Sequence, residues 1–114
     1  MPRSKTHERV HDVVWSGDRT PGADGRVPAV GSTVDPRTVT YENSIGAAQL
    51  ATVWVDPDFD PAERAFYYVR VLEIPTPRHP AFDAVALGMD PATASTRPVS
   101  IQERAYSSPI WYTP

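Results

Sequence analysis

The residues best suited to chemistry lie near the amino-terminal end, where His7, Glu8 and His11 spell the H-E-x-x-H pattern of zinc proteases. That pattern works on a helix, because one turn places both histidines on the same face to bind zinc while the glutamate acts as base. The sequence continues through two valines and Trp15, which predicts a strand over residues 8–15 instead. Residues four apart on a strand are separated by about 13 Å. A zinc peptidase is therefore the weakest alternative, and we predict no metal site and no catalytic residue in this chain.

A second pattern that could bind a cation is formed by Asp56, Asp58 and Asp60, which alternate in the sequence DPDFDP. Alternate carboxylates converge on calcium in an EF-hand loop, but Pro61 stands here where that loop requires glycine, and Tyr67 replaces its bidentate glutamate. We interpret the segment as an Asp-Pro turn between two strands. A looser calcium site is the alternative.

Charged residues interrupt the densest apolar segment, residues 64–74, at Arg70 and Glu73. Buried charges must be paired or displaced to an edge or a site, so both structural pairing and a place at a cleft are open to them. The candidate cleft or domain-interface residues are Arg70, Glu73, Arg78, His79, Glu103, Arg104 and Trp111. The three tryptophans and the tyrosines could form a sugar-stacking platform, but we interpret them as core, the commoner place for aromatics at strand spacing.

The composition limits the classes of fold and partner. Thirteen prolines in 114 residues exclude a helical bundle, because proline lacks an N–H donor and is confined to turns, edges and first helical turns. A net charge of −3 leaves no basic surface on the scale that nucleic acid requires, and no apolar segment is long enough for membrane insertion. There is no cysteine, so neither a disulfide framework nor a thiolate nucleophile is available.

These residues predict a mainly β fold, an antiparallel sandwich-like domain with long loops and one short helix. We expect strands at 8–15, at 45–55 and, as a central strand with both faces covered, at 64–74. Residues 16–40 read as loop with at most a short strand. The helix is expected between Pro80 and Gly88, and the last strand runs from 98 and is kinked or bulged at Pro109. Residues 1–114 form one domain in this prediction, with residues 1–7 disordered.

Three long strings carry a resemblance to a known family. TYENSIGAAQLATVWVDPDFDPAERAFYYVRVLEIPTPR, DAVALG and SIQERAYSSPIWYTP resemble the carboxy-terminal end of the bacterial domain-of-unknown-function family thirty-six oh-four, and ERVHDVVWSGDR resembles its preceding strand. The resemblance implies a much longer parent, often exported to the periplasm or secreted, and similar to the PHP superfamily of metal-dependent hydrolases. It places the ligands for any divalent metal upstream, so no cofactor is expected in this chain.

On this basis the expected function is that of a non-catalytic accessory domain, with the upstream metallohydrolase-like region of the parent as its partner. In the family one more strand precedes residues 8–15, so this strand is expected to expose an unpaired edge, and an exposed edge strand favours a homodimer. The alternative function is a free-standing β-sandwich module that binds a carbohydrate or another small ligand.

Overall fold

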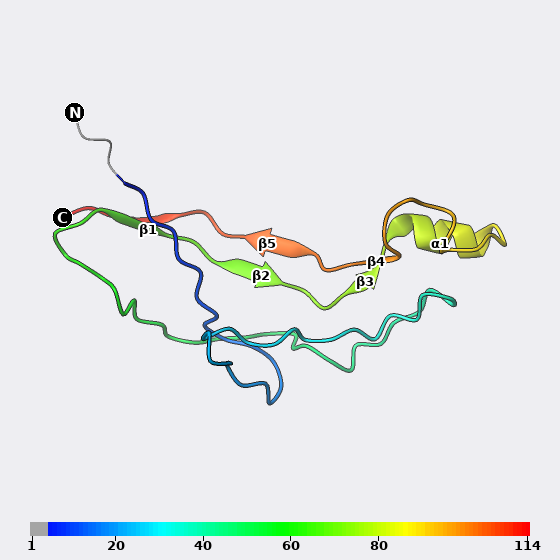
Figure 1. Ribbon diagram of the computed structural model, residues 1–114, viewed down its shortest axis with the longest axis horizontal. Helices are drawn as coiled ribbons and strands as arrows, with labels where there is room; N and C mark the ends of the chain where they lie inside the picture. The colour runs from blue at the N-terminus through cyan, green and yellow to red at the C-terminus, as the bar shows by residue number, and fades with distance from the viewer. Residues whose placement is uncertain (1–4) are drawn as a thin grey trace.

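The computed structural model describes residues 5–114, and its central feature is a long two-stranded antiparallel ribbon (Figure 1). The predicted disorder of residues 1–7 lies in part outside the described residues. The elements follow in the order β1 (Ala65–Tyr67), β2 (Arg70–Leu72), β3 (Thr76–Pro77), α1 (His79–Ala86), β4 (Ser100–Ile101), β5 (Arg104–Tyr106) and β6 (Ile110–Tyr112). The expected mainly antiparallel β structure with one short helix is confirmed.

The strands pair in three successive steps along the ribbon, each of them antiparallel: β3 with β4, β2 with β5, and β1 with β6. The register changes by one residue between the steps. Residues 107–109 lie opposite only residues 68–69, and Ser107 fills this gap by donating its N–H to the Val69 carbonyl and accepting the Val69 N–H on Oγ. An extra residue of this kind is a β-bulge. The bulge expected near Pro109 is therefore confirmed.

A second, opposite shift restores the register near the helix. Residues 73–75 lie opposite residues 102–103, and the Glu73 N–H donates to the Glu103 carbonyl. The extra residue now belongs to the first strand of the ribbon. The two shifts cancel, so β1–β6 and β3–β4 share one register while β2–β5 is offset from both.

Helix α1 closes the ribbon at one end and confirms the prediction made from its terminal residues. Pro80 lies in the first turn, where its missing N–H has no intrahelical partner to lose. Gly88 follows the helix with a φ of 68°, a left-handed conformation that glycine adopts without strain. Ala81 and Ala84 are 4% and 2% exposed. Within residues 5–114, no helix has the length and apolar character that crossing a membrane requires.

The strands predicted at residues 8–15 and 45–55 are wrong, because neither segment contains residues in a strand. Residues 45–55 run beside the ribbon, with Gly46 packed on Ile74 and Trp54 on Tyr67, but without a hydrogen-bonded ladder. Branched and aromatic side chains favour a strand only where neighbours pack on them, and here Val53 is 94% exposed. Residues 8–15 therefore do not provide the exposed strand edge through which a homodimer was expected. Self-association of the chain stays a prediction, but not through this edge.

The segment predicted as a central strand, residues 64–74, has only one neighbour in each of its pairings. It is also uncovered on one face, since Phe66 and Tyr68 are 46% and 42% exposed. Residues 16–40 contain a single isolated bridge, between Asp35 and Thr40, in agreement with the loop prediction.

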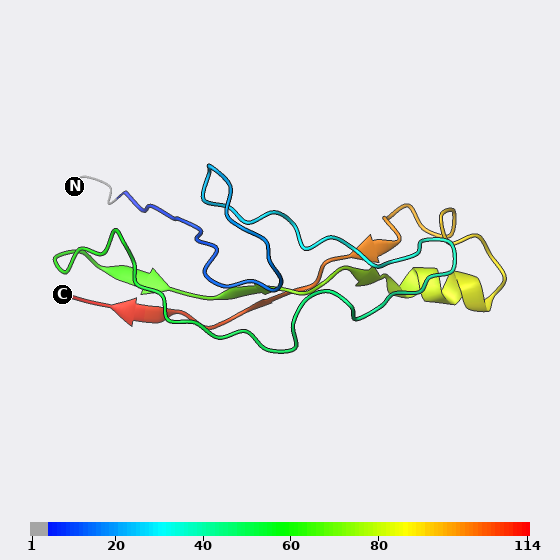
Figure 2. The same ribbon diagram turned by 90° about the horizontal axis from the view of Figure 1, so that it is seen from below.

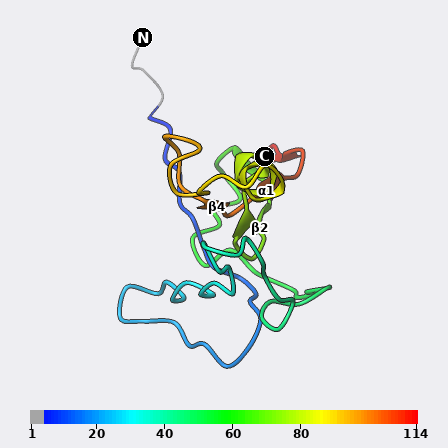
Figure 3. The same cartoon turned by 90° about the vertical axis from the view of Figure 1, so that its right-hand side faces the viewer.

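The molecule is elongated, with principal extents of 61 × 38 × 25 Å and a radius of gyration of 19.3 Å (Figure 2). A compact domain of this length has a radius of gyration of about 13 Å. Figure 3, viewed along the ribbon, shows the loops of residues 16–45 extending to one side of it. Val39, Ala81 and Ala84 are the buried hydrophobic residues in the described part of the chain. The ribbon therefore does not enclose a core of ordinary size.

Candidate functional site

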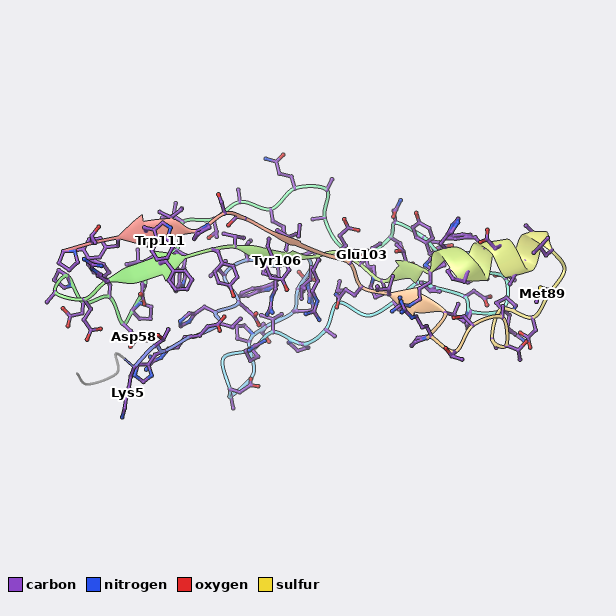
Figure 4. All side chains as sticks on the ribbon, turned by 90° about the horizontal axis from the view of Figure 1, so that it is seen from above. Lys5, Asp58, Met89, Glu103, Tyr106 and Trp111 are labelled. Atoms are coloured by element: carbon purple, nitrogen blue, oxygen red, sulfur yellow. The ribbon has the colours of Figure 1, made fainter. Side chains whose placement is uncertain are left out.

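Four aromatic rings lie in a continuous series along one face of the ribbon, and we call this surface the aromatic face: Phe66, Tyr68, Tyr106 and Trp111. Directly paired residues and alternate residues of a strand share a face, and Phe66 pairs with Trp111. The ring centroids of Trp111 and Phe66 are 5.1 Å apart, those of Phe66 and Tyr68 6.3 Å, and those of Tyr68 and Tyr106 6.2 Å. Figure 4 shows Trp111 and Tyr106 along the length of the ribbon.

The aromatic face is open, although these rings were interpreted as core. Trp111 is 72% exposed and Tyr106 59%, so that interpretation is wrong for both residues. Contiguous exposed apolar surfaces on proteins commonly mark sites of interaction.

The opposite face of the ribbon is partly covered by the chain itself. The Trp54 ring packs edge-on against Tyr67 at 6.4 Å, and the Phe59 ring packs in the same way on Tyr112 at 4.9 Å. The Tyr112 hydroxyl donates to the Pro61 carbonyl at 2.9 Å. Residues 54–61 therefore pack on the face opposite the aromatic face.

The seven residues predicted from the sequence as cleft or interface residues fall into three groups. Arg70, Arg104 and Trp111 share the aromatic face, since Arg70 pairs with Tyr106 and Arg104 with Leu72 on that side of the ribbon. Glu73 and Glu103 lie together at the second register shift, joined by a backbone hydrogen bond; Figure 4 shows Glu103 between the aromatic residues and the helix.

The third group, Arg78 and His79, lies at the start of α1, away from the aromatic face. His79 Nε2 is 3.6 Å from an oxygen of Asp83, one helical turn later. Arg78 lines a small hollow with Arg97 and Ser95 that has about 10 Å³ of internal space, room for about one water molecule. Arg78 Nε is buried and has no hydrogen-bond partner among residues 5–114. The seven residues do not converge on a single cleft.

A cluster that the sequence analysis did not predict joins His11 to Asp56 and Asp58. One ligand atom from each residue lies within 4.8 Å of the other two. The carboxylates already have partners: Asp56 accepts the Tyr67 hydroxyl at 2.7 Å and the Asp58 N–H at 2.9 Å, and Asp58 is ion-paired with Arg9. The Asp58 N–H bond to the Asp56 side chain, two residues back, is typical of the turn that the sequence predicted for DPDFDP.

We expect no stoichiometric zinc, manganese or iron on this chain. A metal at His11 would have to displace the Tyr67 hydroxyl from Asp56 and the Arg9 guanidinium from Asp58. His7 cannot assist through the H-E-x-x-H pattern, because residues 5–15 contain no helix. Elemental analysis of the purified chain after dialysis against each ion checks this, and about one tightly held ion per chain would contradict it.

The Asp56–Tyr67 contact makes stability depend on pH at both ends of the range. The Tyr67 hydroxyl, and next the Asp58 N–H, hold the pKa of Asp56 below its ordinary 3.8. The unfolded chain binds the proton more tightly, so the contribution is present above pH 3.8 and is lost as pH falls through the folded pKa. The same hydrogen bond raises the pKa of Tyr67 above its ordinary 10.0, so that contribution is lost as pH rises past this value.

Tyr67→Phe should therefore flatten the pH dependence of the denaturation midpoint in both acid and alkali. Part of the acid dependence will remain, because backbone hydrogen bonds from Arg37 and Thr38 lower the pKa of Asp35 independently. Asp35→Asn is the matched control, which should remove only the contribution of Asp35 to the acid limb and leave the alkaline limb unchanged. Urea denaturation over the full pH range measures both variants, and an unaltered profile for Tyr67→Phe would exclude the contact as its source.

The described residues thus define an elongated, mainly antiparallel β chain with an open aromatic face. Comparison with protein families identifies it further: the chain belongs to the family described as "Protein of unknown function (DUF3604)", whose model matches residues 2–114. Neither the curated proteins nor the solved structures gave a match. The family assignment provides no evidence of catalysis by this chain.

Proposed function

We propose that this chain is the non-catalytic, carboxy-terminal accessory domain of a larger protein similar to the PHP superfamily of metal-dependent hydrolases. In this proposal the upstream region holds the divalent metal and performs the reaction, and the accessory domain packs on it. The parent acts in the periplasm or outside the cell. The support for these assignments is the resemblance of the sequence to the family and the exposed surface of the chain.

The observation that carries the proposal is the amount of surface left open. The chain exposes 9512 Å², whereas a compact protein of 12.6 kDa exposes about 6,200 Å². Covering this excess of about 3,300 Å² on one partner would bury about 6,600 Å² in total over both partners, at or above the upper end of permanent interfaces, about 2,000–5,000 Å² and more. A partner surface of that size fits a large neighbouring domain.

The open surface is apolar in places where a free-standing protein would be polar. Trp111 is 72% exposed, Tyr106 59%, Phe66 46% and Tyr68 42%. Burial of apolar surface contributes about 25 cal/mol per Å². Covering these side chains with a partner would therefore stabilise an assembly.

Hydrogen exchange on the chain alone and on the chain joined to the upstream region of its reading frame tests the proposal. In the joined form, the amides of β1, β2, β5 and β6 should exchange at least about tenfold more slowly than in the chain alone, because docking removes the open states through which they exchange. The isolated chain should retain a radius of gyration near 19 Å in solution scattering. Equal exchange in both forms, or a compact isolated chain near 13 Å, would overturn it.

One observation favours the alternative function, a free-standing module that binds carbohydrates or other small ligands. The Phe66 and Tyr68 rings are exposed and nearly parallel, with an interplanar angle of 14°. Titration of soluble oligosaccharides against tryptophan fluorescence discriminates between the two functions. Saturable binding by the isolated chain, lost in Trp111→Ser, supports the module and not the accessory domain.

A further inference from the structure

We propose that the aromatic face, together with Arg70 and Arg104, is the surface through which the chain docks, and that its occupant is an acidic, apolar protein surface on the upstream region. This inference rests on the proposed function and specifies which face of the ribbon performs it. Three features of the described residues carry it: the exposure of the aromatic face, its composition and its charge.

The two faces of the ribbon differ in what already covers them. Residues 54–61 pack on one face through Trp54 and Phe59, so a partner there would have to displace part of the chain. The four rings of the aromatic face are 42% to 72% exposed and contact one another in series. A partner can therefore cover this face without rearranging the ribbon.

The composition of the aromatic face is that of an interface centre. Tyrosine, tryptophan and arginine are the residue types most enriched among those that dominate binding energy at protein interfaces. Here Tyr68, Tyr106 and Trp111 lie with Arg70 and Arg104 on one side of two paired strands. The pairing of the strands fixes the spacing of these side chains, which lowers the cost of ordering them on binding.

The charge of the face selects the occupant. Arg70 and Arg104 are both exposed, and neither forms an ion pair with another residue in the described range 5–114. The carboxylate in contact with the face is Glu8, which accepts the Tyr68 hydroxyl at 2.7 Å. A second copy laid face to face would bring four guanidinium groups together against two carboxylates, an arrangement that like-charge repulsion disfavours. The carboxylates of an acidic surface would instead accept hydrogen bonds from the two guanidinium groups, whose planar geometry suits carboxylates.

The aromatic part of the face is tested by two substitutions at neighbouring residues of β6. Trp111→Ser removes a ring from the aromatic face, and Ile110→Ser removes an equally exposed side chain, also 72%, from the opposite face. Binding of each chain to the purified upstream polypeptide is measured by calorimetry. We expect Trp111→Ser to weaken binding at least about tenfold, as at interface centres, and Ile110→Ser to weaken it by less than about threefold. Circular dichroism spectra matching the wild type show that both variants fold.

The charged part of the face is tested by a double reversal with a charge-matched control. Arg70→Glu with Arg104→Glu should weaken binding at least about tenfold and reverse its response to salt, because attraction to the acidic surface becomes a repulsion that salt screens. Arg37→Glu with Arg97→Glu makes the same change in net charge, with Arg97 in the hollow beside Arg78 and Arg37 in the loop of residues 16–40, and should leave both quantities nearly unchanged.

The outcomes separate this inference from the proposed function. Failure of the wild-type chain to bind the upstream polypeptide would overturn both. Wild-type binding that Ile110→Ser weakens and Trp111→Ser does not would overturn the inference alone and place the partner on the other face. Light scattering that shows a saturable dimer of the chain, abolished by Trp111→Ser, would also overturn it, since the occupant would then be a second copy.

Discussion

Replacing Gly46 with alanine is expected to lower the free energy of unfolding by about 2–5 kcal/mol. Gly46 has a φ of 80°, a conformation that costs a residue with a Cβ about 1–2 kcal/mol. The new Cβ would also meet Ile74 Cγ2 at 2.6 Å, closer than carbon atoms approach in real proteins, so one of the two segments must move. Forced contacts of this type cost about 1–3 kcal/mol. Chemical denaturation of the 114-residue chain measures the sum.

Gly31→Ala is the control that separates the two costs. Gly31 has a similar φ, 87°, but nothing lies within 4 Å of the position where its Cβ would be. Gly31→Ala should lower the free energy of unfolding only by the cost of the left-handed conformation, about 1–2 kcal/mol. Equal losses in the two variants would mean that residues 45–55 do not pack on the ribbon at Gly46.

Ala84→Leu should destabilise the end of the molecule formed by α1 and the loop that follows it, by about 1–3 kcal/mol. Ala84 is 2% exposed, the lowest exposed fraction among the buried hydrophobic residues of the described chain. Adding a branched side chain there overpacks the site, although leucine is a good helix former. The loss of helical signal on heating, followed by circular dichroism, measures the effect.

Val85→Leu provides the comparison, because Val85 is adjacent in α1 and 45% exposed. Leucine has the higher helix propensity, so this variant should be neutral or slightly more stable. If Ala84→Leu melts at the same temperature as Val85→Leu, the helix does not pack as described.

The parts of the fold that the sequence predicted correctly are those determined by local chemistry. Pro80 and Gly88 specify the two ends of α1 through backbone preferences that no distant contact is needed to enforce. Pro109 similarly marks the place where the strand pairing is interrupted, because proline has no N–H to give to a ladder.

The strands predicted at 8–15 and 45–55 failed because β propensity reflects packing against neighbours, which a single sequence does not specify. The exposure of Val53 shows how little packing that segment receives in this chain. The same limit explains the aromatic face: the alternation of Phe66 and Tyr68 predicted a shared face, but not whether another layer covers it.

The site was predicted in part. Arg70, Arg104 and Trp111 were named from their residue types, and the ribbon brings all three to one face. Their grouping depends on a pairing between positions about 35–45 residues apart, which the sequence does not encode in any local pattern. The cluster of His11 with Asp56 and Asp58 was missed for the same reason. These residues are far apart in the sequence, and no local pattern indicates that the chain between them folds back to bring them together.

The stepwise pairing of the ribbon also sets an order in which the chain can fold. Thr76 and Ile101 are 25 positions apart, whereas Ala65 and Tyr112 are 47 positions apart, so closing the loop at the helix end costs the least entropy. Once α1 has formed and β3 has met β4, each further pair closes only a few residues more, and the ribbon can zip outward toward its termini. The transition state for folding should then be polarised, with native contacts around α1, β3 and β4 and almost none at β1 and β6. The aromatic face would be completed last, at the end of the ribbon where the chain terminus lies.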